Sequence, residues 1–207
     1  MGKNLKRVKQ AKEAFMKMWE CRDLGEAKEF LKMKIQHTGK KLILDQHDYL
    51  EKIVTWFDLK GSYPVNTPLP TGYEPEENKG TATQVFRLEY QSVIGSLLYI
   101  MIGTKPDISF AVTKIAQFSA NPSSKHMNAA KHILRYLNTT WSASIIYDRG
   151  SNKGLIAFTD SDWASDKIKC RSQTSFFFMI AGAIFLWQSQ AQKTVALSST
   201  QAEYMAV

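Results

Sequence analysis

The sequence predicts an α/β protein in which a β-hairpin and several helices precede a set of sequential strands. Three observations predict this class. Apolar and polar residues alternate over 31–36, and a return strand follows at 41–45. Apolar residues recur at helical spacing over 87–138. Beyond residue 154, short apolar runs of strand length lead into a helix-start signal near residue 199.

The first element is a basic amphipathic helix over residues 3–19. Its apolar stripe is Leu5, Val8, Ala11, Phe15 and Trp19, and its cations are Lys3, Lys6, Arg7, Lys9, Lys12 and Lys17. Two interpretations fit this pattern. In one, the stripe packs on a core and the cations form a solvated face; in the other, the cations contact phosphate groups.

The predicted hairpin turns at residues 38–39. Its first strand places Leu31, Met33 and Ile35 on one face and Lys32, Lys34 and Gln36 on the other. We therefore expect an exposed basic face on this hairpin.

A helix is predicted to begin at Asp48, because Asp48 and Glu51 have the spacing of a capping box. Its apolar stripe is Leu50, Ile53, Val54 and Phe57. Residues 60–85 then hold four of the six prolines, so neither a helix nor a strand can run through them. This stretch is predicted to be a linker or a long surface loop.

Three further helices are predicted over residues 87–103, 107–119 and 123–138, and together they would form a small bundle. The outer side of the third helix carries Lys125, Asn128, Lys131, His132 and Arg135. This row is suited to follow a nucleic-acid backbone, since cations neutralise phosphates. A short connecting strand is expected at 144–147.

Three strands are predicted over residues 155–159, 174–180 and 184–189. Asp160 and Asp162 follow where the first apolar run ends, and Glu203 lies in a helix whose N-cap is Ser198, Ser199 or Thr200. Carboxylates from a strand and the next helix can converge on one divalent cation, and Mg²⁺ prefers oxygen ligands. The alternative is that Asp160 and Asp162 are surface turn residues and Glu203 is a solvated helix position.

Composition suggests an anionic partner. The formal net charge is +8, from 27 Lys and Arg against 19 Asp and Glu. Nucleic acid is the first candidate and an acidic membrane surface the second. The apolar run over 176–187 is too short to span a bilayer and is predicted to be a hairpin. We favour nucleic acid over a membrane surface and expect no membrane partner. Cys21 and Cys170 are interpreted as free thiols in a reducing, intracellular compartment.

Several motifs resemble a known family. Residues 158–166 (Phe-Thr-Asp-Ser-Asp-Trp-Ala-Ser-Asp), 171–175 and 195–206 resemble the ribonuclease H region of copia-type LTR retrotransposon Pol polyproteins. Residues 23–26 (Asp-Leu-Gly-Glu), 94–99, 104–108 (Thr-Lys-Pro-Asp-Ile) and 132–137 resemble the tail of the reverse transcriptase in the same polyproteins. These motifs follow in the same order as in that family and span almost the whole chain.

The resemblance implies four regions. They are the end of the reverse transcriptase palm and the start of the thumb (1–59), a Pro-rich linker or loop (60–85), a helical thumb or connection region (86–150) and a truncated ribonuclease-H-like mixed sheet (151–207). In this arrangement the hairpin would help to grip the primer strand. A truncated sheet would leave the strand at 155–159 with an open edge, so we expect aggregation or partial disorder beyond about residue 150.

The resemblance also implies a site. Asp160 would correspond to the first-strand aspartate of the family and Glu203 to its helix glutamate, both as catalytic residues and ligands of Mg²⁺ in two-metal cleavage of RNA–DNA hybrids. Nucleic acid would contact Lys32, Lys34, Lys125, Lys131 and Arg135. The family's other metal-binding aspartates would lie outside this sequence, so the Mg²⁺ site would be incomplete and no polymerase metal site is expected.

Three functions remain open at this stage. The first is a Pol segment that lacks polymerase and nuclease activity alone and works with the remainder of the polyprotein. The second is a non-catalytic remnant that binds an RNA–DNA hybrid or other nucleic acid. The third is an active ribonuclease H completed by another chain or by residues beyond this sequence.

Overall fold

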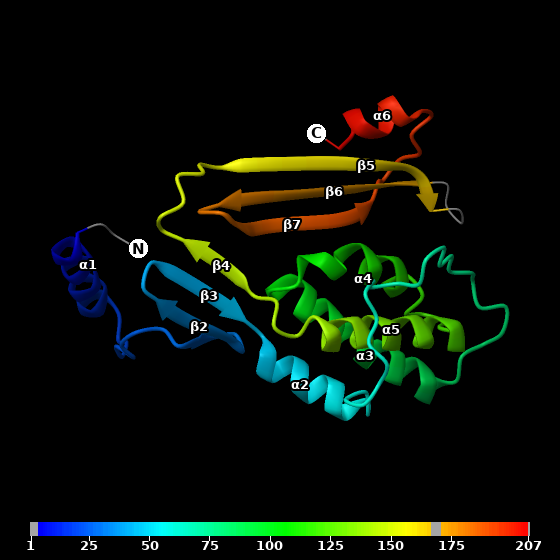
Figure 1. Ribbon diagram of the computed structural model, residues 1–207, viewed down its shortest axis with the longest axis horizontal. Coiled ribbons are helices and arrows are strands. Elements are labelled where there is room, and N and C mark those ends of the chain that lie inside the picture. Colours follow the sequence, from blue (N-terminus) through cyan, green and yellow to red (C-terminus); the bar gives the residue numbers. More distant parts are fainter. Residues whose placement is uncertain (1–3, 167–170, 207) are drawn as a thin grey trace.

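The computed structural model describes residues 4–166 and 171–206 (Figure 1). In chain order, the helices are α1 (Leu5–Met18), α2 (His47–Trp56), α3 (Gln84–Gly103), the 3-10 turn η1 (Pro106–Ile108), α4 (Ser109–Ala116), α5 (Ser124–Thr139) and α6 (Ser199–Tyr204). The strands are β1 (Glu29–Phe30), β2 (Met33–Thr38), β3 (Lys41–Asp45), β4 (Ile145–Asp148), β5 (Ile156–Asp166), β6 (Arg171–Ile180) and β7 (Ala183–Ala191). The three predicted bundle helices are confirmed, with the middle one starting as a 3-10 turn.

The hydrophobic core lies among α2, α3, α4 and α5. α3 is the central helix, and Tyr90, Leu97 and Ile100 on it are completely buried. The Tyr90 hydroxyl donates a hydrogen bond of 2.8 Å to the carbonyl of Ile115 on α4, so this large side chain is buried without an unpaired hydroxyl. Among the described residues, α3 alone is long and apolar enough to cross a membrane by length and composition, and a third of its most apolar window is buried in this core.

Four strands form sheet A in the order β1-β2-β3-β4, and all neighbours are antiparallel. The predicted hairpin of β2 and β3 is confirmed, but its first strand is shorter than predicted. Leu31 and Lys32 have φ values of 48° and 57° and form the turn between β1 and β2. Two consecutive positive φ values suit a two-residue hairpin turn, and the Tyr99 hydroxyl of α3 donates to the Leu31 carbonyl.

The start of α2 differs from the predicted capping box. The helix begins at His47 with Gln46 as the N-cap, and no side chain of Gln46 caps it. Asp45, at the end of β3, accepts a hydrogen bond of 3.2 Å from the His47 amide instead. Asp48 is therefore inside the first turn, where it forms an ion pair with Lys34.

The segment over residues 57–83 is a surface loop that contacts the bundle, rather than a free linker. Leu69 and Tyr73 pack against the core, and the Asn78 amide donates a hydrogen bond of 2.9 Å to the Pro122 carbonyl before α5. No helix or strand occurs in this described segment, as its prolines predict.

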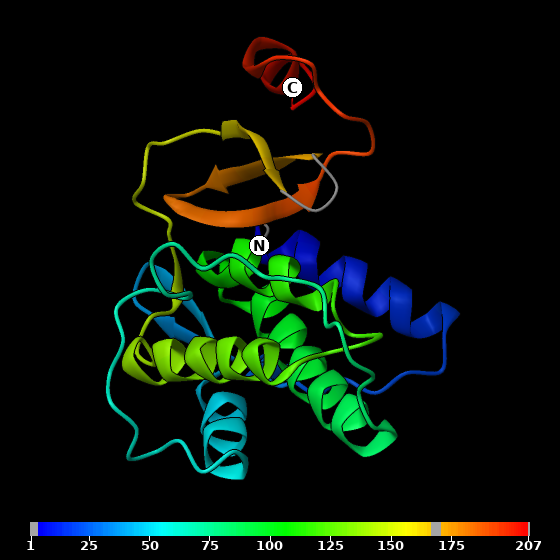
Figure 2. The same cartoon turned by 90° about the vertical axis from the view of Figure 1, so that its right-hand side faces the viewer.

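The last strands form sheet B in the order β5-β6-β7, again antiparallel throughout. The hairpin over 176–187 is confirmed. β5 continues to Asp166, so Asp160 and Asp162 lie inside the strand rather than beyond its end, which corrects the sequence prediction. Sheet B lies between the helical bundle and α6 (Figure 2). Two small antiparallel sheets with helices are thus present, whereas the expected ribonuclease-H-like sheet was mixed, and that arrangement stays a prediction.

Candidate functional site

Asp160 lies near the middle of β5, on the sheet face that looks toward the bundle. It pairs in register with Ser175 of β6, which in turn pairs with Ser189 of β7. Two residues earlier, Phe158 stacks on Phe177 with ring centroids 4.7 Å apart. Phe177 of β6 also pairs in register with Trp187 of β7. The indole N–H of Trp187 donates a hydrogen bond to the Met101 carbonyl at the end of α3. Asp160 is exposed in this setting.

Glu203 lies on α6, which packs across the opposite face of sheet B. The Thr159 hydroxyl donates a hydrogen bond of 2.7 Å to the Ala206 carbonyl, just after this helix. The buried Gln192 amide nitrogen lies 2.9 Å from both the Thr174 hydroxyl and the Ala202 carbonyl. These contacts fix α6 beside β5. Glu203 itself is exposed.

The N-terminus of α6 is capped by its own sequence. Ser198 is the N-cap, and its hydroxyl accepts a hydrogen bond of 3.1 Å from the Gln201 amide. The Gln201 side chain reaches back and accepts a hydrogen bond of 2.8 Å from the Leu197 amide. Gln201 therefore stabilises the start of the helix that carries Glu203.

The two predicted metal ligands come from adjacent elements, but successive residues of a strand point to opposite faces. Because Thr159 faces α6, Asp160 faces away from it. Within residues 4–166 and 171–206, no group of three His, Cys, Asp or Glu side chains is placed to hold a metal ion. The assignment of Asp160 and Glu203 as Mg²⁺ ligands therefore stays a prediction.

The five predicted nucleic-acid contacts lie on two separate parts of the fold. Lys32 and Lys34 belong to the β1–β2 turn and β2, whereas Lys125, Lys131 and Arg135 lie on α5. Three of them form ion pairs within the chain: Lys32 with Glu29 (3.7 Å), Lys34 with Asp48 (2.8 Å) and Lys125 with Glu76 (3.3 Å). The hydrogen bond from Lys34 lowers the pKa of the Asp48 carboxyl and raises the pKa of Lys34.

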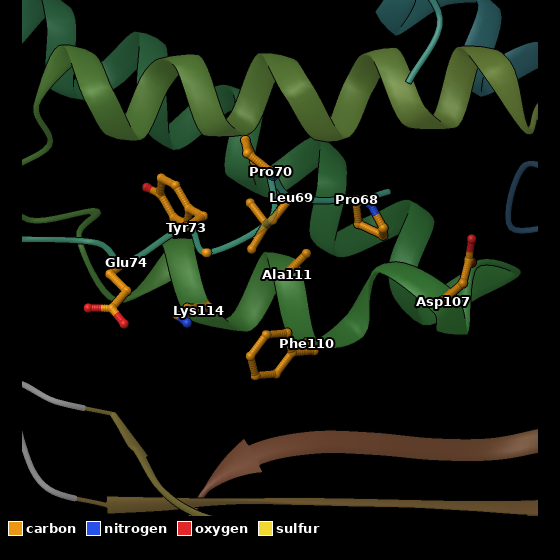
Figure 3. A pocket seen from close by; sticks show the side chains of 10 residues that line it. Pro68, Leu69, Pro70, Tyr73, Glu74, Asp107, Phe110, Ala111 and Lys114 are labelled. Carbon is orange, nitrogen blue, oxygen red and sulfur yellow. The ribbon is translucent and has the colours of Figure 1, made fainter. Parts of the chain in front are cut away.

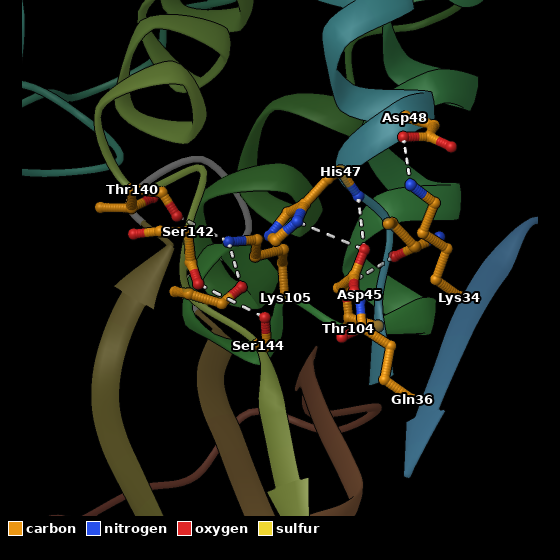
Figure 4. Close-up of polar contacts among 12 residues, drawn as sticks. Lys34, Gln36, Asp45, His47, Asp48, Thr104, Lys105, Thr140, Ser142 and Ser144 are labelled. Carbon is orange, nitrogen blue, oxygen red and sulfur yellow. Dashed lines mark hydrogen bonds and ion pairs between the residues drawn. The ribbon is translucent and has the colours of Figure 1, made fainter. Parts of the chain in front are cut away.

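A buried polar joint, which the sequence analysis missed, connects the hairpin to the helices (Figure 4). The Thr104 hydroxyl at the end of α3 donates a hydrogen bond of 2.9 Å to the side-chain oxygen of Gln46. Lys105 is 3% exposed, and its ammonium donates to the carbonyls of Thr140 and Ala143 at 2.8 and 2.9 Å, which closes the C-terminus of α5. Burial lowers the pKa of Lys105.

The motif over 104–108 is therefore structural in this fold. Besides Thr104 and Lys105, it supplies Asp107, which accepts a hydrogen bond of 2.8 Å from the Tyr136 hydroxyl of α5. Pro106 starts η1, where its missing amide needs no partner. The only local signal for this role was a lysine, Lys105, between an apolar helix and a proline. Its partners, Thr140 and Ala143, are more than 30 residues away in sequence.

A separate cavity of about 490 Å³ lies between the Pro-rich loop and α4 (Figure 3). Its walls include Pro68, Leu69, Phe110 and Ala111, and Lys114 lies over the Phe110 ring with its ammonium 5.2 Å from the ring centroid. It contains none of the residues that the sequence analysis proposed as a site.

Comparison with known proteins identifies the relatives of this chain. A family model described as reverse transcriptase (RNA-dependent DNA polymerase) matches residues 1–71. The retrovirus-related Pol polyprotein from transposon TNT 1-94 of Nicotiana tabacum is 37% identical over all of this chain and 16% of its own length. The Pol polyprotein from transposon RE1 of Arabidopsis thaliana is 33% identical over 91% of this chain and 13% of its own length.

A shorter relative is also similar. An uncharacterized mitochondrial protein of Arabidopsis thaliana is 32% identical over 91% of this chain and 78% of its own length. No solved structure matches the chain. The chain thus spans about one sixth or less of the Pol polyproteins that it matches, yet those matches extend over nearly all of its residues. The protein therefore belongs to the Pol polyproteins of copia-type retrotransposons, of which it is a segment.

Proposed function

We propose that this segment holds an RNA–DNA hybrid within a Pol polyprotein, and that sheet B with α6 is the opening part of a ribonuclease-H-like unit. One observation carries the proposal. Three consecutive antiparallel strands are followed by a helix packed on the first of them, with Asp160 on that strand and Glu203 on the helix. This order is the one that the family resemblance predicts.

Binding rather than cleavage is the proposed role of the segment by itself. Two carboxylates from opposite sides of β5 are a poor donor set for two Mg²⁺ ions, which need several shared carboxylate ligands. The charge of +8 favours a polyanion in either case, because phosphate neutralisation releases counterions. An RNA–DNA hybrid is the proposed ligand, since the reverse transcriptase named by the matching family is an RNA-dependent DNA polymerase.

The test is fluorescence anisotropy of a labelled RNA–DNA hybrid titrated with the purified chain at several salt concentrations. We expect binding whose logarithmic affinity falls linearly with the logarithm of salt concentration. A DNA duplex of the same sequence shows whether the hybrid is preferred, and vesicles of anionic lipid test for a general polyanion surface. Absence of hybrid binding at about 50 mM salt, or a preference for the vesicles, would rule out this function.

A second candidate is an active ribonuclease H completed by further polypeptide. The observation in its favour is that β5 has no strand neighbour on its outer edge among the described residues, so a further strand can pair beside Asp160. The test uses a longer Pol polypeptide that contains this segment. Mg²⁺-dependent cleavage of the hybrid that disappears in Asp160→Asn, while hybrid binding persists, would favour this candidate over the first.

A further inference from the structure

The fold brings two distant basic segments together at one end of sheet A. β3 and β4 pair in the register Lys41 with Asp148, although these residues lie more than 100 positions apart. Just beyond that pair, the Arg149 amide donates a hydrogen bond of 3.0 Å to the Lys40 carbonyl. The turn between β2 and β3 therefore lies against the connection between β4 and β5, and Figures 1 and 2 both show them side by side.

This end of the sheet is exposed and positively charged. Lys40, Lys41, Arg149 and Lys153 are all exposed, and we call these four residues the end patch. A Cβ at Gly150 would lie 3.9 Å from Cδ of Lys40, so the stem of this lysine reaches the β4–β5 connection. Asp148, the last residue of β4, accepts a hydrogen bond of 2.7 Å from the Gly150 amide and shapes the start of the connection.

The three lysines of the end patch differ from three of the predicted contacts in their ion pairing. Lys32, Lys34 and Lys125 each form an ion pair with a carboxylate of the chain. In the described part of the chain, no carboxylate lies within ion-pair distance of Lys40, Lys41 or Lys153. A phosphate that binds a paired lysine must replace an existing partner, whereas one that binds an unpaired lysine replaces only mobile counterions. Lys40, Lys41 and Lys153 are thus better phosphate sites than Lys32, Lys34 and Lys125.

The position of the end patch suits a long ligand. The Asp148 amide donates a hydrogen bond of 2.9 Å to the Ala181 carbonyl in the turn between β6 and β7. The patch therefore lies where sheet A meets sheet B. A nucleic-acid backbone bound there can extend from the reverse-transcriptase-like hairpin toward the strand that carries Asp160.

We propose that the end patch binds the phosphodiester backbone of the nucleic acid held by this segment. The inference rests on the proposed function and names the surface that performs it. The ligand class is a phosphodiester backbone without base readout, because lysines contact phosphates as point charges. The residues Lys40, Lys41 and Lys153 replace the paired lysines as the principal contacts.

The experiment compares two triple variants with the same loss of charge. One combines Lys40→Gln, Lys41→Gln and Lys153→Gln, and the matched control combines Lys32→Gln, Lys34→Gln and Lys125→Gln. We expect the first to lower the slope of log affinity against log salt by about 2 to 3, at about 0.7 to 0.9 per lost phosphate contact. The control should lower it by less than about 1, since its lysines are already paired.

Equal losses in the two variants, or a larger loss in the control, would overturn the inference while leaving hybrid binding intact. If the unaltered chain does not bind the hybrid, the proposed function and the inference both fail. Anionic vesicles are titrated in parallel, and end-patch-dependent binding to vesicles alone would overturn the inference in favour of a lipid surface.

A second measurement uses the unaltered chain, so its result does not depend on whether the variants fold. Lysine acetylation by a small reagent is followed by mass spectrometry with and without the hybrid. Protection of Lys40, Lys41 and Lys153 that exceeds protection of Lys32, Lys34 and Lys125 supports the inference. The reverse order of protection overturns it.

Discussion

Gly103, at the end of α3, packs closely against the side chain of Gln46. A Cβ added at Gly103 would clash with the side-chain nitrogen and oxygen of Gln46, whereas one added at Gly95 on the same helix would have nothing within 4 Å. The Gln46 side chain is buried and hydrogen-bonded to Thr104 and the Tyr99 carbonyl, so moving it aside loses these bonds. Gly103→Ala should therefore destabilise the chain by about 1 to 3 kcal/mol. Gly95→Ala should be neutral or stabilising by up to about 1 kcal/mol, since alanine favours a helix. Urea unfolding of both variants checks this pair, and similar effects at the two positions would contradict it.

His126 predicts a dependence of stability on pH. It is 1% exposed, and its Nδ1 accepts a hydrogen bond of 3.0 Å from the Ser123 amide at the start of α5. Burial lowers the pKa of His126 below its ordinary value of 6.5. The unfolded chain therefore takes up the proton first, so stability is present above pH 6.5 and is lost as pH falls from 6.5 toward the lower folded pKa.

His132, whose pKa is also lowered, contributes in the same direction. His126→Asn retains a side-chain acceptor for the Ser123 amide but does not titrate. The free energy of unfolding should consequently fall less between about pH 7 and about pH 5.5 in this variant than in the unaltered chain. An unchanged pH slope would show that His126 does not carry the effect.

At the scale of elements, α1 is set apart from the rest. Residues 6–32 are exposed throughout, and on α1 and its C-cap Phe15 and Trp19 remain 58% and 61% exposed. The predicted amphipathic helix is thus confirmed, but the described core does not cover its apolar stripe from Val8 to Trp19. Deleting residues 1–19 should change the free energy of unfolding by less than about 0.5 kcal/mol, as for other surface changes. A loss above about 1 kcal/mol in urea unfolding would contradict this expectation.

Periodicity was sufficient to predict most elements but not their partners. The hairpin, α3, α5 and the hairpin of sheet B each have their pattern within one short segment. The pairing of β3 with β4 joins residues about 100 positions apart, and β1 is only two residues long, so neither leaves a local signal.

The candidate site was predictable to the same extent. The motifs located Asp160 and Glu203, but the face to which Asp160 points depends on how far β5 extends and where α6 packs. Lys105 and the end patch could not be predicted, because their roles depend on contacts with residues far away in the sequence. A lysine is recognised as a buried cap or an unpaired surface cation only when its neighbours are known.

At the scale of the whole molecule, the bundle and sheet B differ in how they are stabilised. The bundle encloses a continuous cluster of buried apolar side chains, whereas sheet B and the residue before it leave Leu155, Phe158 and Leu186 at 65%, 49% and 49% exposure. Apolar surface that stays in water contributes little to the free energy of folding. Sheet B is joined to the rest by a few polar contacts, such as the hydrogen bond of 3.1 Å from Trp187 to the Met101 carbonyl.

We therefore expect sheet B to open before the bundle. In native-state hydrogen exchange, amides of β6 should exchange through openings of lower free energy than those of α3, because local opening costs less where few apolar groups are buried. A dye for exposed hydrophobic surface should bind the native chain. The variant Trp187→Phe removes the hydrogen bond to α3. It should lower the opening free energy of β6 by about 1 kcal/mol without changing that of α3. A single cooperative melt with no dye binding, or equal protection in β6 and α3, would show instead that the contacts between sheet B and the bundle are strong enough to make one unit of them.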